Sequence, residues 1–138
     1  MIMHTKPSRQ EVLNIKEAAA ICREAARYIM NIELLLDEVS ILGIDRIINI
    51  AWPKEPEGDP EKDAYRYELW GCYLGEAMCV VLDGAWVKTS HGLGVMVGDE
   101  VVYPIEIIER RFVKGMQNPV SDFFLACKKR LTKYPARL

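Results

Sequence analysis

This chain of 138 residues has few histidines, only two, and its four cysteines lie far apart in the sequence. The cysteines form no C-x-x-C pair and have no neighbouring histidine, so they lack the spacing of a zinc site. Each stands among apolar residues, which is typical of reduced thiols in a protein core. A cysteine nucleophile would also need a histidine base. We therefore predict no catalytic residue, metal or cofactor, and expect reduced thiols at Cys22, Cys72, Cys79 and Cys127.

The chain also lacks an excess of charge of one sign, because 18 basic residues stand against 20 acidic ones and the formal net charge is −2. This balance gives no general electrostatic case for nucleic acid, which is not the expected partner. The C-terminal segment is nevertheless basic. We interpret it as a solvated helix end whose cations complement the helix dipole, and contact with phosphate is the alternative. Its cations are Lys128, Lys129, Arg130, Lys133 and Arg137.

Long hydrophobic runs are absent as well. The most apolar stretch, residues 69–82, contains Glu76 and falls short of the ~20 apolar residues of a membrane-spanning helix. Residues 1–7 have no apolar segment of the kind found in a secretory signal peptide. The sequence therefore predicts a cytoplasmic protein with no membrane partner.

The length fits one domain, residues 1–138, and the apolar pattern predicts its elements. Ser8 and Glu11 have the spacing of a capping box, and Asp37 is a candidate N-cap for the next helix. Short β-rich runs between glycine-containing turns predict an antiparallel meander. For residues 32–36 the sequence leaves three alternatives open, which are an extended connector, a strand and a helix. The expected helices cover about residues 8–30, 38–50, 61–82, 105–115 and 119–132, and strands 85–90, 93–97 and 100–104 fall within about 85–104.

The first helix has an apolar stripe at three- and four-residue spacing, which we expect to face the core. Alanines beside the stripe, at residues 18–20 and 25–26, would let another element pack closely. The residues before this helix, including His4, are expected to fray. The stripe consists of Val12, Ile15, Ala19, Cys22, Ala26 and Ile29.

The predicted fold class is α+β, with helices packed on a small antiparallel β-meander in a single domain. After Leu69 the helix over residues 61–82 is apolar on nearly all sides, so we expect it at the centre of the fold. Gly71 and Gly75 lie inside it, and each costs about 1 kcal/mol of helix stability relative to alanine. This cost indicates that another backbone, that of the hairpin, approaches the helix at both glycines.

Glu76 is the single charge in the apolar part of that helix, and a buried carboxylate needs a partner or a raised pKa. We predict Arg110 or Arg111 as its partner, and Lys114 is a further candidate. As a structural pair they would join two helices, and Glu76→Ala would cost about 3 kcal/mol. As a functional site, the same residues and Trp86 would line a pocket for a polar ligand. We prefer the structural interpretation, because no second carboxylate, metal-ligand set or nucleophile converges on the pair in the sequence.

His91 follows Ser90 in the predicted hairpin turn. A histidine base at this position would need an orienting acid, which the sequence does not identify. The glycines of residues 92–98 lack the spacing of a phosphate-binding loop and suit hairpin turns.

Three short motifs follow one another along the chain: G-C-Y-L-G-E at residues 71–76, G-A-W at 84–86 and P…R-R-F-V-K-G at 104–115. Their order resembles a family of small bacterial proteins of unknown function. Leu36-Asp37 and Ile44-Asp45 also resemble an L-D…L-D stretch upstream in that family, so the resemblance covers about residues 33–126. That family has a G-x-Y-L-G-E helix, a G-x-W strand and a P…(K/R)-R-x-x-x-G helix. The resemblance implies no established activity, although some members are similar to immunity proteins encoded near secreted toxins. Arg110 stands where the pattern often has lysine, a change that keeps the charge and alters the geometry.

Three functions are consistent with these features. The first is a non-enzymatic protein-interaction, regulatory or immunity-type factor, whose contact surfaces would be the acidic loop over residues 54–63 and exposed aromatic residues. The second is a small-ligand-binding protein or enzyme with a pocket around Glu76, Trp86 and Arg111. The third is nucleic acid contact through the basic C-terminal helix. We take the first as the expected function, with another protein as the partner.

Overall fold

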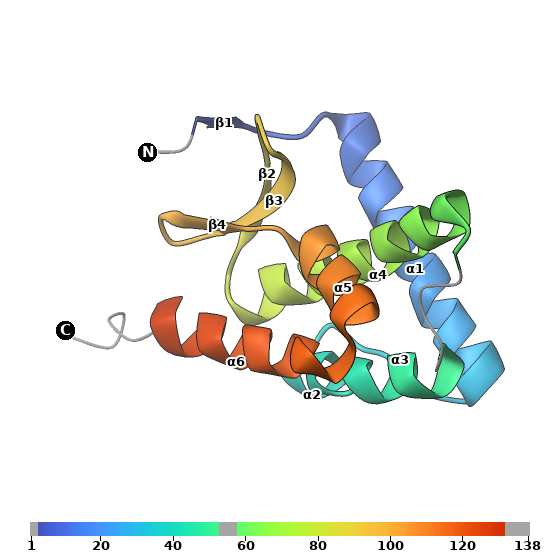
Figure 1. The fold of residues 1–138 in the computed structure, drawn as a ribbon. Coiled ribbons are helices and arrows are strands. Elements are labelled where there is room, and N and C mark those ends of the chain that lie inside the picture. The colour runs from blue at the N-terminus through green and yellow to red at the C-terminus, as the bar shows by residue number, and fades with distance from the viewer. Residues whose placement is uncertain (1–2, 53–57, 132–138) are drawn as a thin grey trace.

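The computed structural model describes residues 3–52 and 58–131, and Figure 1 shows a small sheet at one end of a group of helices. Helix α1 (Arg9–Met30) begins at the predicted capping box. Glu11 N donates to Ser8 Oγ (3.1 Å), and Ser8 N donates to Glu11 Oε1 (2.8 Å). The helix ends at Asn31, whose φ of 54° lies in the left-handed region. The prediction of a first helix over about residues 8–30 is therefore confirmed.

An irregular connector over residues 32–36 leads into two short helices, α2 (Glu38–Leu42) and α3 (Ile44–Ala51). Asp37 caps α2 as predicted, since its Oδ1 accepts a hydrogen bond from Ser40 N at 2.8 Å. The prediction of one helix over 38–50 is wrong, because Gly43 separates α2 from α3. A glycine in a helix interior costs about 1 kcal/mol relative to alanine, which favours a break there. The isoleucines buried on the two sides of the break are Ile41, Ile44, Ile47 and Ile48.

Helix α4 (Pro60–Val81) is the central element that the sequence predicts. Its N-cap, Asp59, accepts hydrogen bonds from two backbone N–H groups of the first turn. Helices α1 and α5 (Pro104–Lys114) pack against it, and most residues of its C-terminal half are buried (Figure 1). Neither α4 nor any other helix within residues 3–52 and 58–131 is long and apolar enough to cross a membrane.

Two glycines of α4 permit close approaches by two different elements. A Cβ atom at Gly75 would overlap the ring of Trp86 in strand β2 (Ala85–Thr89), so the hairpin approaches here as predicted. A Cβ atom at Gly71 would lie 2.6 Å from Ile105 Cα. The prediction that the hairpin also approaches Gly71 is therefore wrong, because the start of α5 occupies that place.

The sheet is an antiparallel meander of order β1-β2-β3-β4. Strand β3 (Gly92–Val97) pairs with β2, and strand β4 (Glu100–Val102) pairs with β3. The register places Trp86 opposite Val95, whose side chain is fully buried. These are the three strands that the sequence predicts.

Strand β1 (His4–Thr5) adds a short fourth strand, which pairs with the end of β2. The expectation that residues around His4 fray is wrong, since backbone hydrogen bonds at the sheet edge order these two residues. Their exposed side chains give no apolar pattern from which such pairing could be predicted.

Helix α5 continues through a 3-10 turn, η1 (Gly115–Gln117), into helix α6 (Val120–Leu131), which packs against α2 and α3 (Figure 1). The chain forms a single α+β domain, as predicted. Its core lies around α4, and its largest fully buried side chains include Tyr73, Leu74, Met78, Ile108 and Phe124.

Candidate functional site

Glu76 lies where α1, α4 and β2 meet, and its side chain is 15% exposed. Trp86 Nε1 donates to Glu76 Oε2 at 3.2 Å, and Lys16 Nζ lies 3.4 Å from Glu76 Oε1. The structure therefore brings Glu76 and Trp86 together. The predicted pairing of Glu76 with an arginine is wrong, because a lysine of α1 and the indole N–H take that position.

Arg111 is buried and pairs with Asp45 of α3 instead. Arg111 Nε donates to Asp45 Oδ1 at 2.7 Å, and Arg111 Nη2 donates to the carbonyl oxygen of Asp45 and to Asn49 Oδ1. The Asp45 carboxylate also accepts from Val120 N (2.9 Å) and Ser121 N (3.0 Å), which are the first N–H groups of α6. This buried network joins α3, α5 and α6, and its role is structural.

Asp45 is not among the predicted site residues, because an aspartate beside Arg46 has the pattern of a solvated surface. A usable signal lies in the spacing of α3, where Ile44, Ile47 and Ile48 are apolar. Asp45 falls on the same side of the helix as Ile48, and is buried with it.

Arg110 lies on the outer face of α5, with its closest carboxylate oxygen, Glu106 Oε1, 3.9 Å from Nη2. It is therefore separated from Glu76, although the sequence placed them in one candidate site. Arg110 borders a hollow of about 250 Å³ between α5 and α6, together with Asp122 and Phe123. Five hollows among residues 3–52 and 58–131 are lined by residues other than Glu76, Trp86 and Arg111, and none of these five supports the predicted ligand site.

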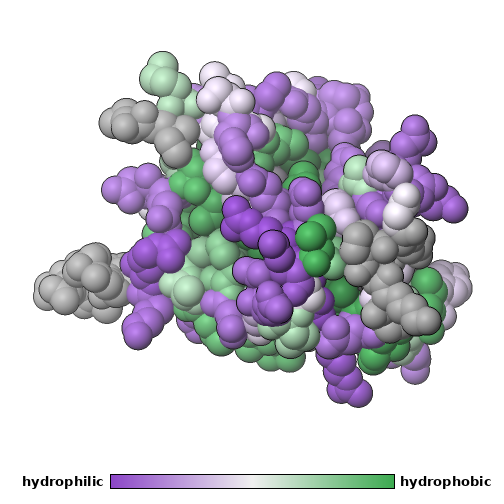
Figure 2. Space-filling model, in the orientation of Figure 1, coloured by the Kyte–Doolittle hydropathy of each residue, from purple (hydrophilic) through white to green (hydrophobic). Residues whose placement is uncertain are grey.

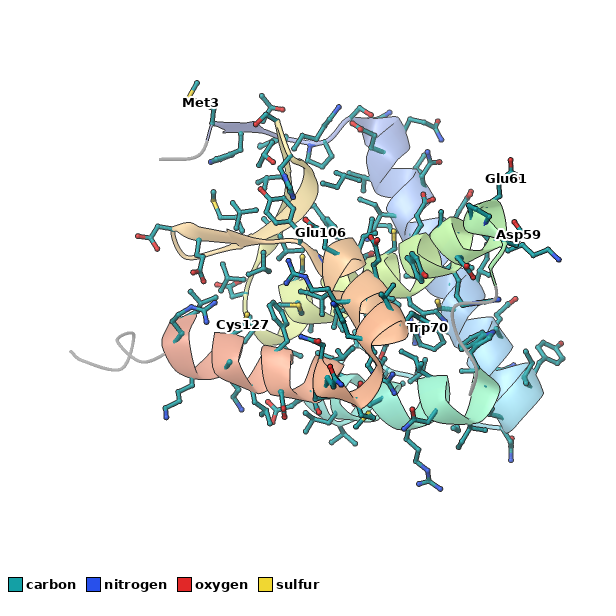
Figure 3. The ribbon with its side chains drawn as sticks, viewed as in Figure 1. Met3, Asp59, Glu61, Trp70, Glu106 and Cys127 are labelled. Atoms are coloured by element: carbon teal, nitrogen blue, oxygen red, sulfur yellow. The ribbon has the colours of Figure 1, made fainter. Side chains whose placement is uncertain are left out.

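His91 has the acidic partner that the sequence does not identify. Its Nε2 lies 2.6 Å from Glu106 Oε2. Glu106 is in the first turn of α5 and is labelled in Figure 3. The imidazole ring also packs edge-on against Tyr103, with ring centroids 4.7 Å apart. The histidine side chain is largely exposed to solvent. The arrangement joins the turn between β2 and β3 to α5.

The four cysteines are free thiols, and three of them are buried. Burial raises the pKa of the Cys72 and Cys79 thiols to about 12, and it raises the pKa of Cys22 even further. Thiols in this state are protonated near neutral pH and are weak nucleophiles. Within residues 3–52 and 58–131, no group of three or more His, Cys, Asp and Glu side chains could hold a metal ion.

An apolar hollow of about 260 Å³ lies between α1 and the N-terminal half of α4. Ile21 and Ala25 of α1 line one side, and Tyr65 and Leu69 of α4 line the other. Trp52 also borders it and packs edge-on against Trp70 and Phe112 in the interior. The charged residues of the lining are two cations, Lys62 and Arg66.

Large apolar side chains at this hollow and along α1 beyond it remain exposed. Tyr65 and Ile21, which line the hollow, are 55% and 46% exposed, and Tyr28 and Ile29, nearer the end of α1, are 85% and 72% exposed. Residues 21, 25, 28 and 29 follow helical spacing, so they share one face of α1. Figure 2 shows hydrophobic residues at the surface beside the C-terminal end of α1. We call this set the α1–α4 apolar surface: Ile21, Ala25, Tyr28, Ile29, Tyr65 and Leu69.

Ile29 belongs to the apolar stripe of α1 that is predicted to face the core, and this prediction is wrong, because Ile29 is exposed. The buried stripe ends at Ala26, which is fully buried, one turn before the end of α1. Ile21 and Tyr28 lie off the buried stripe, and apolar residues in such positions are the signal that could have revealed this surface.

The other predicted contact surfaces are only partly described. Of the acidic loop over residues 54–63, residues 54–57 lie outside the described residues, while Asp59 and Glu61 are exposed at the outer end of α4 (Figure 3). In the basic C-terminal segment, Lys128 pairs with Glu38 and Arg130 pairs with Glu100. Residues 133 and 137 lie outside the described residues, so nucleic acid contact stays a prediction.

Comparison with known proteins finds no matching family model, no matching curated protein and no matching solved structure. The fold and the surfaces define a single-domain α+β protein with a concentrated apolar surface. The resemblance to small bacterial proteins stays a prediction.

Proposed function

We propose that this chain is a non-enzymatic protein-binding protein and that the α1–α4 apolar surface is its contact surface. The observation that carries this proposal is an apolar hollow bordered by the exposed side chains of Ile21 and Tyr65, with the exposed Tyr28 and Ile29 further along α1. Contiguous apolar patches of this kind mark interaction sites, whereas single exposed apolar residues are ordinary.

The residue types at this surface favour a protein partner. Tyrosine is enriched in protein interfaces, since its ring supplies apolar contact area and its hydroxyl group finds a polar partner. The hollow would accept an apolar side chain of the partner, and the exposed Lys62 at its border favours a partner segment that carries an acidic residue.

The polar clusters support the same proposal because they join elements of the fold. Asp45 and Arg111 connect three helices, and His91 with Glu106 connects the hairpin turn to α5. Glu76 is partnered by Trp86 and Lys16. A regulatory or immunity-type role in the cytoplasm is part of the proposal, and the identity of the partner would decide it.

The test compares the wild-type chain with Tyr65→Glu and with Val80→Glu. Each tagged chain is used to capture proteins from an extract of cells that make the protein naturally. Val80 is a matched control, since it is an apolar residue of α4 that is 61% exposed and lies about 22 Å along the helix axis from Tyr65. We expect a partner that the wild type and Val80→Glu retain and that Tyr65→Glu loses.

The captured partner is then purified and its affinity for each chain is measured by calorimetry. A charge placed in an apolar interface core should weaken binding about tenfold or more. Equal affinity of the partner for wild type and Tyr65→Glu would show that binding occurs elsewhere and would overturn the assignment of this surface.

A further inference from the structure

We infer that the outer edge of strand β4 binds an extended segment of another protein, which joins the sheet as a new strand beside β4. This inference goes beyond the proposed function, because it concerns a different surface from the α1–α4 apolar surface. Two observations carry it. The backbone of Val101 points away from the sheet without a partner, and a hollow between β4 and two helices lies directly beside this edge.

The turn that precedes β4 fixes the direction of its backbone groups. A two-residue turn that begins at Gly98, whose φ is 64°, joins β3 to β4, so Val97 and Glu100 form a hydrogen-bonded pair. Hydrogen-bonded and non-hydrogen-bonded pairs alternate along an antiparallel ladder, so the next pair, Met96 with Val101, is not hydrogen-bonded. The N–H and carbonyl groups of Val101 therefore point away from β3.

The ladder between β2 and β3 leads to the same direction independently. Its turn also contains two residues, so Thr89 and Gly92 form a hydrogen-bonded pair, and alternation makes Ala85 and Met96 another. The backbone groups of Met96 therefore point toward β2. Within the part of the chain that the structure describes, no hydrogen bond to the backbone of Val101 is present. One donor and one acceptor at this edge are thus available to an added strand.

A hollow of about 210 Å³ lies beside the edge of β4 (Figure 1). Residues 100–103 line one side, and Ile107 of α5 and Phe123 of α6 line the other. A second hollow of about 250 Å³, bordered by the same two side chains, adjoins it between α5 and α6. Neighbouring strands lie about 4.8 Å apart, so a strand added to β4 would extend the sheet over α5 and α6.

An edge strand beside a hollow suits an extended peptide in particular. In strand addition the main-chain hydrogen bonds supply affinity, and pockets for alternate side chains supply specificity. At β4 the Val101 backbone would supply the hydrogen bonds. The hollow would receive one apolar side chain of the segment, against Ile107 and Phe123.

The charges beside the hollow indicate a second feature of the segment. The two glutamates of the lining have close partners, since Arg130 Nη2 lies 2.8 Å from Glu100 Oε2 and His91 Nε2 lies 2.6 Å from Glu106 Oε2. Arg110 also borders both hollows, and its nearest carboxylate oxygen is 3.9 Å away. Of the two arginines of the lining, Arg110 therefore has the weaker partner.

The position of Arg110 favours a segment that carries a carboxylate. Its side chain is 62% exposed and lies where the two hollows adjoin. Asp122 borders only the second hollow, away from β4. We therefore expect an acidic residue of the segment on the β4 side of Arg110, next to the apolar residue that fills the hollow.

The test begins with a phage-displayed library of random peptides of about ten residues, which is longer than a typical strand. Peptides that bind the Val101→Pro chain are removed, and the remainder is selected on the full-length wild-type chain. We expect enriched peptides in which β-branched or aromatic residues alternate with other residues and an acidic residue is present.

The most enriched peptide is then synthesised, and its dissociation constant is measured by fluorescence anisotropy. Val101→Pro should raise this constant about tenfold or more, because proline removes the outward N–H donor. Val101→Thr is the matched control, since it keeps the N–H and a β-branched side chain, and it should leave the constant unchanged. Circular dichroism should show that Val101→Pro is folded, because proline is tolerated where an edge N–H faces outward.

A second measurement leaves the protein unaltered. The peptide is N-methylated at one residue at a time, which removes one N–H donor in each version. Methylation at the residue that bonds Val101 should weaken binding about tenfold or more, and methylation at the next residue should have little effect, because its N–H points the other way. Arg110→Gln should weaken binding of the acidic peptide more than that of its neutral glutamine counterpart.

The inference would be overturned if no selected peptide prefers the wild type to Val101→Pro. Equal effects of methylation at successive residues would also overturn it, because the peptide would not bind as a strand. Sedimentation velocity examines a second copy as the occupant, and self-association that Val101→Pro abolishes would overturn the assignment to another protein. Tyr65→Glu should bind the peptide as the wild type does. A failure at β4 would therefore leave the proposed function to its own test.

Discussion

Two junctions of this fold are each organised around one carboxylate, and their environments differ. At the junction of α3, α5 and α6, Asp45 and its partner Arg111 are both buried. At the junction of α1, α4 and β2, Glu76 is 15% exposed, but its cationic partner Lys16 is 62% exposed. The exposure of the partner therefore distinguishes the junctions more strongly than the exposure of the carboxylate itself.

This difference has a physical consequence for stability. A buried charge whose partner is removed retains its full desolvation cost, whereas a partly exposed charge recovers hydration by water. The Asp45 carboxylate also accepts two hydrogen bonds from the N-terminal turn of α6, which have no equivalent at Glu76 among the described contacts. We therefore expect the two carboxylates to differ severalfold in their contribution to the free energy of unfolding.

The largest expected effect is that of Asp45→Ala, which should lower the free energy of unfolding by about 3–5 kcal/mol. The substitution leaves the Arg111 guanidinium group buried without its carboxylate and leaves Val120 N and Ser121 N without their acceptor. Urea denaturation followed by circular dichroism measures the change.

The neighbouring Arg46→Ala is the control for Asp45→Ala, because Arg46 is exposed on the same helix. A surface substitution of this kind should change stability by no more than about 0.5 kcal/mol. A loss below about 1 kcal/mol for Asp45→Ala would mean that the buried network is not the main support of this junction.

Local signals account for what the sequence predicted correctly. The capping box at Ser8, the N-cap at Asp37 and the meander with its glycine turns depend on residues a few positions apart. Trp86 and Glu76 are ten positions apart, and both were in the candidate site, although their contact was not predicted.

Contacts between distant parts of the chain account for what the sequence did not reveal. Asp45 and Arg111 are 66 positions apart, so the helix pattern around each residue contains no information about the other. Strand β1 depends on backbone pairing with residues near the end of β2, and no side-chain pattern encodes it. The α1–α4 apolar surface was not predicted for a related reason. Ile29 continues the spacing of the buried stripe of α1, and the spacing alone does not show that this residue is exposed.

The second expected effect concerns the close approach beside Glu76. Gly75→Ala should lower the free energy of unfolding by about 1–3 kcal/mol, because its Cβ atom would overlap the ring of Trp86. The displaced indole would also lose its hydrogen bond to Glu76, so the tryptophan fluorescence spectrum should change with the stability. The same substitution in a Trp86→Leu background should cost less, since the smaller side chain leaves room for the methyl group. A stabilisation by Gly75→Ala, as expected from helix propensity alone, would contradict the close approach.

The smallest expected effect is that of Glu76 itself, and it tests the comparison most directly. Glu76→Ala should cost about 1 kcal/mol, the worth of an ordinary hydrogen bond, in place of the roughly 3 kcal/mol expected for a buried ion pair. Glu76→Gln should cost less, because its amide oxygen still accepts from Trp86 Nε1 and only the ion pair with Lys16 is lost. The difference between Glu76→Gln and wild type should shrink at high salt, since Lys16 is exposed and its attraction is screened. A cost of Glu76→Ala equal to that of Asp45→Ala would show that the exposure of the partner does not decide the energetics of the two junctions.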